Sequence, residues 1–287
     1  MLALLVALQG NGCSRQSSLS SDQGNDTTEP ADRMSTFSSS KDVARPETIE
    51  SLKAKFEDLR AKAEAGDSAA QDNLGHCYSF GKGVVKDEVE GVKWYLKAAE
   101  QNDVQAQYFL SLCYSQGRGV AKDDMEAMRW CRKAAEQNYA IAQGRLAASY
   151  YLGRGAATNY VEAVKWFHKA AEQNDAAAQN DLGYCYARGQ GVETNYVEAV
   201  KWYRRAAEQN FVVAQYRLGN CYYEGRGVAK DNVEAYAWLF VAAAQDYAPA
   251  KEIMTDLNAS LSQADIVEGR RRANERVNLD SILNGPK

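Results

Sequence analysis

Large apolar, small and polar positions follow one another in a pattern that returns every 36 residues along most of the chain. Tryptophan marks the pattern most clearly, because every tryptophan belongs to it: Trp94, Trp130, Trp166, Trp202 and Trp238. A leucine and a glycine keep the same step, at Leu74, Leu110, Leu146, Leu182 and Leu218 and at Gly83, Gly119, Gly155, Gly191 and Gly227. Such a period is typical of stacked helical pairs. The pattern therefore predicts one elongated array, not two separate domains.

Polar residues divide each repeat into two helices. In the first copy, a helix over residues 68–80 is followed by a glycine-containing loop and a second helix over 88–101. An Asp or Asn stands before each second helix with a Glu three positions later, which predicts a capping box in which the Glu reaches back to the cap. Four of the five second helices are followed by an asparagine, Asn102, Asn138, Asn174 or Asn210, and Asn tolerates the left-handed conformation of a helix end.

Residue size predicts how the helices pack. A small residue stands beside each recurrent leucine, and we expect it to let the Ala-Ala pair of the second helix, such as Ala98-Ala99, approach closely. The tryptophans should fill the space between repeats, each burying about 150–250 Å². Residues 47–66 are predicted to form an N-terminal capping helix, 67–247 the five repeats, and 248–287 C-terminal capping helices. We expect the arginine run at Arg270, Arg271 and Arg272 to be a solvated face of this cap.

The N-terminus has the features of a lipoprotein signal. Residues 1–13 begin with the apolar run MLALLVAL and end in Gly12-Cys13, and the polar, Ser-rich residues 14–46 should form a disordered tether. Gly10 stands where a lipobox usually has Leu, and no basic residues precede the apolar run. We expect lipidation of Cys13 and a cell-envelope location, periplasmic or at the surface. The alternative is a disordered apolar N-terminus of a cytoplasmic protein.

The order small-xx-Leu-Gly-xx-Tyr-xx-Gly-x-Gly-Val, then Asp, then Ala-xx-Trp-xxx-Ala-Ala resembles the Sel-1-like repeat family, a relative of the tetratricopeptide repeats. The resemblance implies an all-α fold, a right-handed α-solenoid of about five helix-pair repeats with helical caps. It also implies a non-catalytic scaffold or adaptor that binds a protein or peptide. The alternative is a cell-envelope accessory or a regulator of a cell-wall enzyme.

Charge and candidate chemistry add little to this picture. The net charge is -4 and no basic stripe is present, so nucleic acid is not an expected partner. His76 and His168 are the only histidines and stand on different predicted helices, so we expect no catalytic site, no metal and no cofactor. The Gly-x-Gly loops lack the Gly-Lys-Ser/Thr of a P-loop. Equivalent cysteines in stacked repeats lie too far apart for disulfides, although free thiols are unusual in an oxidising compartment. A monomer is expected.

The binding surface can be placed by resemblance to tetratricopeptide arrays, in which the first helix of each pair lines a concave groove. Transfer of that register predicts a groove formed by Asp72, His76, Tyr108, Leu112, Tyr151, Asn180, Tyr184, Arg188, Tyr216, Asn220 and Tyr223. These positions vary between repeats and are rich in tyrosine, which suits interfaces. The alternative is that the rings pack against the adjacent helix.

Overall fold

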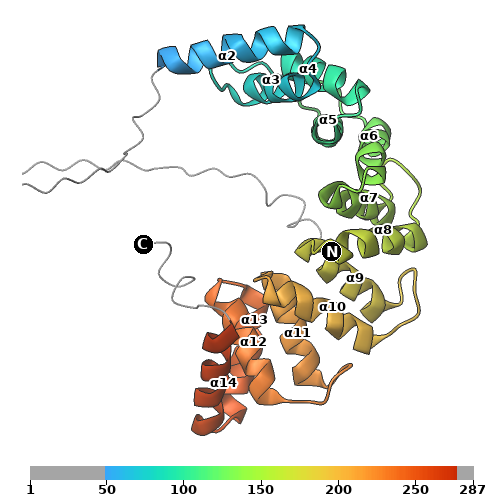
Figure 1. Cartoon of the computed structure of the whole chain (residues 1–287). Helices are drawn as coiled ribbons and strands as arrows, with labels where there is room; N and C mark the ends of the chain where they lie inside the picture. Colours follow the sequence, from blue (N-terminus) through green and yellow to red (C-terminus); the bar gives the residue numbers. More distant parts are fainter. Residues whose placement is uncertain (1–48, 277–287) are drawn as a thin grey trace, which may run out of the picture.

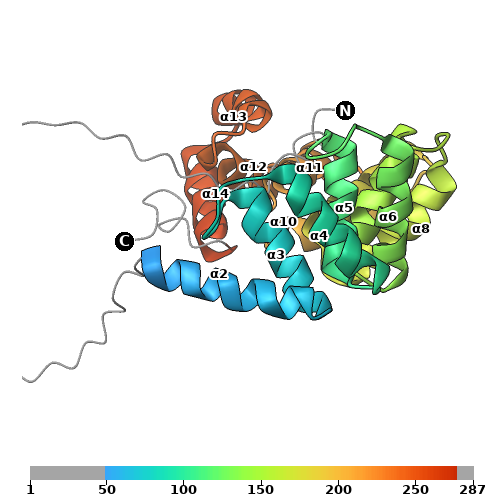
Figure 2. The ribbon, with the colours of Figure 1, turned by 90° about the horizontal axis from the view of Figure 1, so that it is seen from above.

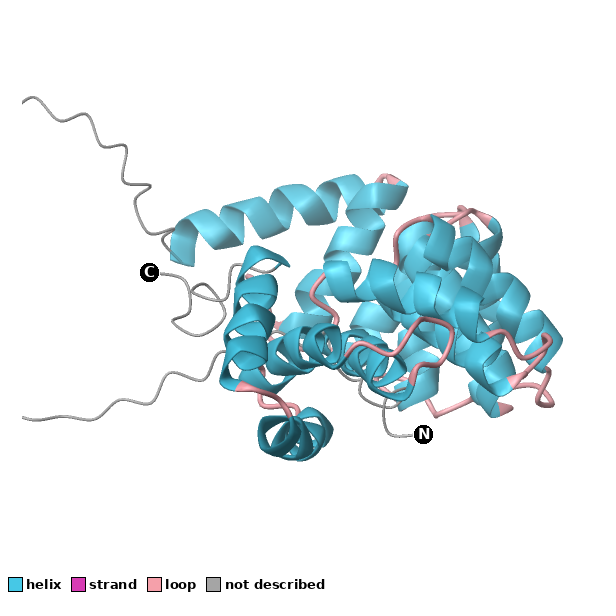
Figure 3. Ribbon diagram, turned by 90° about the horizontal axis from the view of Figure 1, so that it is seen from below, coloured by secondary structure: helices cyan, strands magenta, loops and turns pink. Residues whose placement is uncertain are grey.

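The computed structural model of the protein describes residues 49–276 as a curved stack of helices (Figure 1). All regular elements in this range are α-helices, as the colouring of Figure 3 shows. They are α2 (Ile49–Glu64), α3 (Ser68–Phe80), α4 (Glu88–Glu100), α5 (Val104–Gln116), α6 (Asp124–Glu136), α7 (Ala140–Leu152), α8 (Tyr160–Glu172), α9 (Ala176–Arg188), α10 (Tyr196–Glu208), α11 (Val212–Glu224), α12 (Asn232–Ala244), α13 (Ala248–Ser260) and α14 (Gln263–Arg276). The predicted all-α solenoid is confirmed.

Each helix packs on its neighbours in sequence, and the stack bends into an arc. Figure 1 shows α5 and α7 on the inner side of the arc, with α6 and α8 outside them. The two ends, α2 and α14, both lie toward the open side (Figures 1 and 2). The C-terminal helix departs from this order, because α14 packs mainly on α12 and not on α13, its neighbour in sequence. No helix within residues 49–276 combines the length and the apolar character needed to cross a bilayer.

The helix ends confirm one half of the predicted capping box and correct the other. The Asp87 side chain accepts a hydrogen bond from the Glu90 backbone N–H at 2.9 Å, and the same cap recurs in all five repeats. The Glu90 carboxylate does not reach back to the cap; it pairs with Lys93 at 2.8 Å. A cation one turn further along the helix is the stronger partner for a carboxylate, and it competes with the backbone N–H.

Residues with a left-handed backbone conformation follow both the first and the second helix of each repeat. The predicted asparagines adopt φ angles between 63° and 68°. Gly117 ends α5 with φ of 69°, and Gly119 in the following loop also has φ of 69°. Gly119 has a second requirement, because a Cβ added there would lie 2.1 Å from the Glu88 carbonyl oxygen of the preceding repeat. The second loop glycine therefore sets how closely adjacent repeats stack.

The core confirms the predicted place of the tryptophans and corrects that of the small residues. Trp94 is buried against Phe56 and Leu74, so it joins its own repeat to the preceding helix. A Cβ at Gly75 would lie 2.6 Å from the Tyr95 ring. The small residue at Gly75 therefore makes room for a large side chain of the second helix, Tyr95, and the Ala98-Ala99 pair is not among its nearest contacts.

A ladder of buried glutamines runs through the stack. Gln143 is 2% exposed; its Nε2 donates to the Ala135 carbonyl at 3.1 Å, and its Oε1 accepts from Gln173 Nε2 at 2.7 Å. The same pair of bonds recurs at 36-residue intervals, with Gln71, Gln107, Gln179 and Gln215 in the place of Gln143. Because buried polar groups are costly unless paired, the ladder fixes the register of each second helix against the next first helix.

The arginine run is only partly a solvated face. Arg271 is exposed and pairs with Glu268. Arg270 donates to the Tyr236 hydroxyl at 3.3 Å, and Arg272 reaches Glu234 at 3.2 Å, so both join α14 to α12. The expectation of a solvated face thus holds for Arg270 and Arg271, which are both exposed, and is wrong for the half-buried Arg272, because the last repeat offers it a carboxylate.

Candidate functional site

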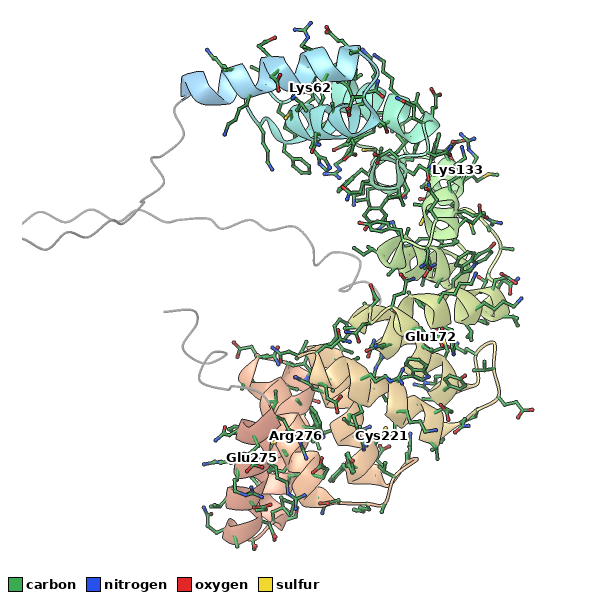
Figure 4. The ribbon with its side chains drawn as sticks, in the orientation of Figure 1. Lys62, Lys133, Glu172, Cys221, Glu275 and Arg276 are labelled. Carbon is green, nitrogen blue, oxygen red and sulfur yellow. The ribbon has the colours of Figure 1, made fainter. Side chains whose placement is uncertain are left out.

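The predicted groove residues come from the first helices of the five repeats, α3, α5, α7, α9 and α11. The structure brings them together in two groups and leaves the others apart. Asp72 and His76 form the group at the α3 end. Asn180, Tyr184 and Arg188 form the group on α9. Figure 4 shows the side chains along the arc, with Lys133 of α6 on its outer side, where its amine lies over the Trp130 ring at 4.1 Å.

The α3 group combines a buried carboxyl with an imidazole. His76 Nε2 lies 3.6 Å from Asp72 Oδ2, and the Tyr95 hydroxyl lies 3.1 Å from His76 Nδ1. Burial, with a smaller contribution from Asp103, raises the pKa of Asp72 to about 7. Burial also lowers the pKa of His76, helped by Lys82. Both shifts oppose charge, so this contact is not a strong ion pair at neutral pH.

The α9 group is organised by Arg217 from the next first helix. Arg217 Nη1 donates to Asn180 Oδ1 at 3.0 Å, and its guanidinium lies 4.6 Å from the centre of the Tyr184 ring. Arg188 approaches the same ring at 5.6 Å. Asn180 Nδ2 also donates to Asp181 Oδ1 at 2.9 Å. The tyrosine is therefore held between two cations, an arrangement that favours a fixed ring.

Four predicted tyrosines contact neighbouring parts of the array. Tyr108 meets Tyr139 at 5.5 Å and Tyr216 meets Tyr247 at 5.3 Å, the same contact in different repeats. The Tyr151 hydroxyl donates to Gln190 Oε1 at 2.5 Å, and the Lys230 amine lies 5.5 Å from the Tyr223 ring. Leu112 and Asn220 are half-buried on α5 and α11. These rings thus pack against neighbouring helices, the alternative to a groove role, although none of the four is fully buried.

Sequence reasoning missed the residues one position after Asp72 and after its equivalents in the other four repeats. Phe109 lies 4.2 Å from His76, Arg145 Nη2 donates to Ser115 Oγ at 2.8 Å, and Arg217 organises the α9 group. Asp181 takes the same position in the fourth repeat and is buried, which raises its pKa to about 7 while Arg217 opposes the shift. The signal was present, because this position holds four residue types in the five repeats: Asn73, Phe109, Arg145, Asp181 and Arg217.

Within residues 49–276, no cluster of three or more His, Cys, Asp or Glu side chains could hold a metal ion. His168 lies on α8, where its Nδ1 is 3.5 Å from Glu172, far along the chain from His76. Burial raises the pKa of the Cys131 thiol to about 12, so this buried group is a poor nucleophile at neutral pH.

A curved stack of five matched helix pairs, with side chains on its inner helices that differ between repeats, defines an α-solenoid repeat protein. The chain belongs to the Sel1 repeat family, whose model matches residues 68–103, 104–139, 140–175, 176–211 and 212–247. Proteins of this family generally mediate protein–protein interactions.

Two solved structures are similar over most of the chain. The protein c5321 of uropathogenic Escherichia coli, described as a protective antigen with an SLR fold, is 33% identical with a TM-score of 0.74. The alignment covers 81% of this chain and 50% of c5321, so this chain spans about half the length of that protein. A Sel1 repeat protein from Oxalobacter formigenes is 31% identical with a TM-score of 0.68, over 79% of this chain and 92% of that one. No curated protein matches the chain.

Proposed function

We propose that the protein is a non-catalytic scaffold that binds a protein or peptide in the concave groove lined by α3, α5, α7, α9 and α11. The supporting observation is the contrast between the two kinds of position in the repeat. Packing positions such as the buried leucines and glutamines are the same in every copy, whereas the groove positions differ. A surface that recognises a ligand without internal repetition needs such differences.

The proposal can be tested with a pair of tyrosines that keep part of their surface exposed. The full chain is used as bait in a lysate of its host, and the recovered partner is then titrated against Tyr184→Ala combined with Tyr216→Ala. We expect binding to weaken by about 2 kcal/mol or more, because truncated aromatic residues at the centre of an interface cost this much. The melting temperature should change little, since both side chains are only half-buried.

The matched control also removes two half-buried tyrosines, Tyr196→Ala combined with Tyr222→Ala. Tyr196 begins α10, and the Tyr222 hydroxyl accepts a hydrogen bond from Arg204 of α10, so neither residue belongs to the predicted groove. The control should bind the partner as the wild type does. Equal weakening in both double variants, or a large fall in melting temperature in the Tyr184 and Tyr216 variant, would assign the rings to stability and contradict the groove. Recovery of no partner under gentle conditions counts against the scaffold.

We also propose that Cys13 is lipidated and anchors the protein in the cell envelope, periplasmic or at the surface. Cys13 lies outside the described residues, and the support comes from the apolar run, Gly12 and the polar segment that follows. The description of the similar E. coli protein as a protective antigen favours an envelope location. Labelling with a palmitate analogue should mark the wild type and not Cys13→Ser. Equal labelling, with both proteins soluble, would show that the anchor is absent.

A further inference from the structure

The α3 group and the α9 group stand at equivalent positions of the first and fourth repeats, and each is completed by one residue of the next first helix. The equivalent residues are Asp72, His76 and Phe109 in the one and Asn180, Tyr184 and Arg217 in the other. In the fourth repeat, the guanidinium of Arg217 donates to Asn180 Oδ1 at 3.0 Å and lies 4.6 Å from the centre of the Tyr184 ring. The fold therefore places a cation beside the first of these three positions.

The first repeat lacks this cation. Phe109 stands in the place of Arg217, and its ring packs edge-on against His76 with centroids 4.2 Å apart. Asp72 Oδ1 is buried and has no hydrogen-bond partner among residues 49–276. Asp72 Oδ2 lies 3.6 Å from His76 Nε2, too far for a hydrogen bond. Asp72 is thus without the donor that its counterpart Asn180 receives.

A carboxyl group without a donor is costly at this position. The Asp72 side chain is 7% exposed, and a buried charge without a partner destabilises a protein. Asparagine is equally buried at the equivalent position 180, so a neutral side chain of the same shape fits there. A group that costs stability and makes no hydrogen bond in the described part of the chain is a candidate for binding a ligand.

The surroundings of Asp72 favour a planar cation. Burial, and after it the negative charge of Asp103, raises the pKa of Asp72. Burial, and after it Asp72, raises the pKa of Tyr139, so this ring also faces the carboxyl group. Asp103, Phe109 and Tyr139 are each half-buried, which leaves them open to a side chain of a partner. A guanidinium pairs with carboxylates through parallel N–H donors and stacks on aromatic rings.

We propose that the concave groove binds an arginine side chain of the protein partner at its α3 end, with the guanidinium on the Asp72 carboxylate and against the rings of Phe109 and Tyr139. The proposal rests on the proposed scaffold function and names the part of the partner that binds here. The partner's guanidinium does for Asp72 what Arg217 does for Asn180. It approaches Asp72 Oδ2, because Oδ1 is buried.

Two probes of similar shape and different charge give a direct test on the full chain. We expect N-acetyl-argininamide to shift the carboxyl resonance of Asp72 and the amide resonances of Phe109 and Tyr139, with a dissociation constant of about 1 mM or more, since one side chain buries little area. N-acetyl-citrullinamide carries a neutral urea and should bind about tenfold more weakly, because hydrogen bonds between ionised groups are stronger. Equal affinity of the two probes, or shifts confined to other repeats, would overturn the proposal.

The affinity for N-acetyl-argininamide should also depend on pH through Asp72. With its pKa at about 7, the carboxylate is about one-tenth populated at pH 6 and about nine-tenths at pH 8, so the affinity should rise about tenfold. The other titratable groups that face Asp72 are His76, Tyr95, Asp103 and Tyr139. Burial lowers the pKa of His76 and raises those of the two tyrosines, so none of these three becomes charged as the pH rises from 6 to 8. A constant affinity over this range contradicts the role of Asp72.

Asp72→Asn separates binding from stability. It keeps the shape of the side chain and should abolish probe binding while raising the melting temperature at pH 8, because the unpaired carboxylate is removed. The control Asp175→Asn removes a half-buried carboxylate at the N-cap of α9, where asparagine caps equally well, and should leave probe binding unchanged. Probe binding that survives in Asp72→Asn, or equal loss in the control, overturns the site. A fall in the melting temperature of Asp72→Asn would assign the carboxyl group to the fold.

Phe109→Arg places the chain's own guanidinium beside Asp72, as Arg217 stands beside Asn180. It should pair with the carboxylate and weaken the binding of N-acetyl-argininamide at least about tenfold, because the probe must displace an intramolecular partner. Unchanged probe binding in this variant contradicts the proposal. Should Asp72→Asn fail to fold, Phe109→Arg decides.

The same variants separate this proposal from the scaffold function. A partner whose binding is lost in the Tyr184 and Tyr216 double variant but kept in Asp72→Asn shows that the groove acts without an arginine at its α3 end, and the proposal is then wrong. Probe binding at Asp72 with no protein partner recovered leaves a site for a guanidinium and removes the scaffold.

Discussion

Replacement of each loop glycine after α5 by alanine should separate backbone strain from inter-repeat contact. Gly117 and Gly119 share φ of 69°, so alanine at either position is forced into the left-handed region. That conformation costs an L-residue about 1–2 kcal/mol. The smaller conformational entropy of the unfolded alanine chain offsets about 0.4–1 kcal/mol of this cost. We therefore expect Gly117→Ala to lower the free energy of unfolding by about 1 kcal/mol.

The two positions differ in what a Cβ would touch. At Gly117 the nearest atom is the Lys122 Cβ at 3.4 Å, an ordinary contact, whereas at Gly119 it is the Glu88 carbonyl oxygen at 2.1 Å. Backbone of the preceding repeat cannot turn away as a side chain can, so the repeats must move apart. Overpacking of this kind adds about 1–3 kcal/mol. Gly119→Ala should thus cost about 2–4 kcal/mol in total.

Urea denaturation followed by circular dichroism measures both variants against the wild type. Because repeat arrays can lose two-state behaviour, the curves are fitted with a nearest-neighbour model, in which Gly119→Ala should weaken the interface between the first and second repeats. Gly117→Ala should instead lower the intrinsic stability of its own repeat. If the two variants unfold at the same urea concentration, close approach at Gly119 does not control stacking, and the steric reasoning is refuted.

Three further predictions concern buried polar groups. Gln143→Leu should lower the free energy of unfolding by about 2–3 kcal/mol in denaturation experiments. Each hydrogen bond of the Gln143 side chain is worth about 1 kcal/mol, and the substitution also leaves the bonded groups without a partner. A change under about 0.5 kcal/mol, typical of surface substitutions, would show that the glutamine ladder is dispensable. The pKa of Asp181 is raised from 3.8 to about 7 in the folded state, so its contribution to stability is present at low pH and is lost as the pH rises through about 7. Asp181→Asn should remove this loss, stabilising the protein at pH values above about 7 but not below about 4, and thermal melts across that range that parallel the wild type would contradict it. Glu234→Gln removes the ion pairs with Arg272 and Arg276 and should weaken the attachment of α14 by about 2 kcal/mol, a value reduced because both arginines are partly exposed. Limited proteolysis should then release α14 earlier than in the wild type.

The repeated helices could be predicted from the sequence because the residue types that mark them, such as tryptophan in the core and Asp or Asn at a helix start, each have one common structural role. Tryptophans at a constant step predicted the stacked pairs, and Asp or Asn before each second helix predicted where that helix begins. The glutamine ladder kept the same step and was overlooked, because Gln143 and its equivalents are polar and a search for the core counts apolar residues. A polar residue that recurs as strictly as a tryptophan is itself a sign of burial.

The candidate site was less predictable, since it depends on contacts between repeats. Spacing places Asn180 and Tyr184 on one helix face, but only the structure shows that Arg217 from the next helix holds both. The register likewise assigned Tyr151 to the groove without indicating its bond to Gln190 in the following loop. The periodicity of the sequence predicts which face of a helix a residue occupies. It does not predict the contact that the residue makes, because the contacting side chain belongs to a neighbouring repeat, where this position varies.

The two ends of the array are held by different contacts, so the array should unfold from one end when it is pulled. The last repeat is held by a network in which Glu234 accepts from Trp238, Arg272 and Arg276. At the other end, α2 covers the stack chiefly with buried Phe56 and Ala63. A chain of nearest-neighbour contacts comes apart first at its weaker end. A pulling force should therefore unfold the array from α2 onward, so the group of Asp72 and His76 would be lost while the α9 group is still intact. Tension would then release a partner's contacts at the α3 end before those at α9.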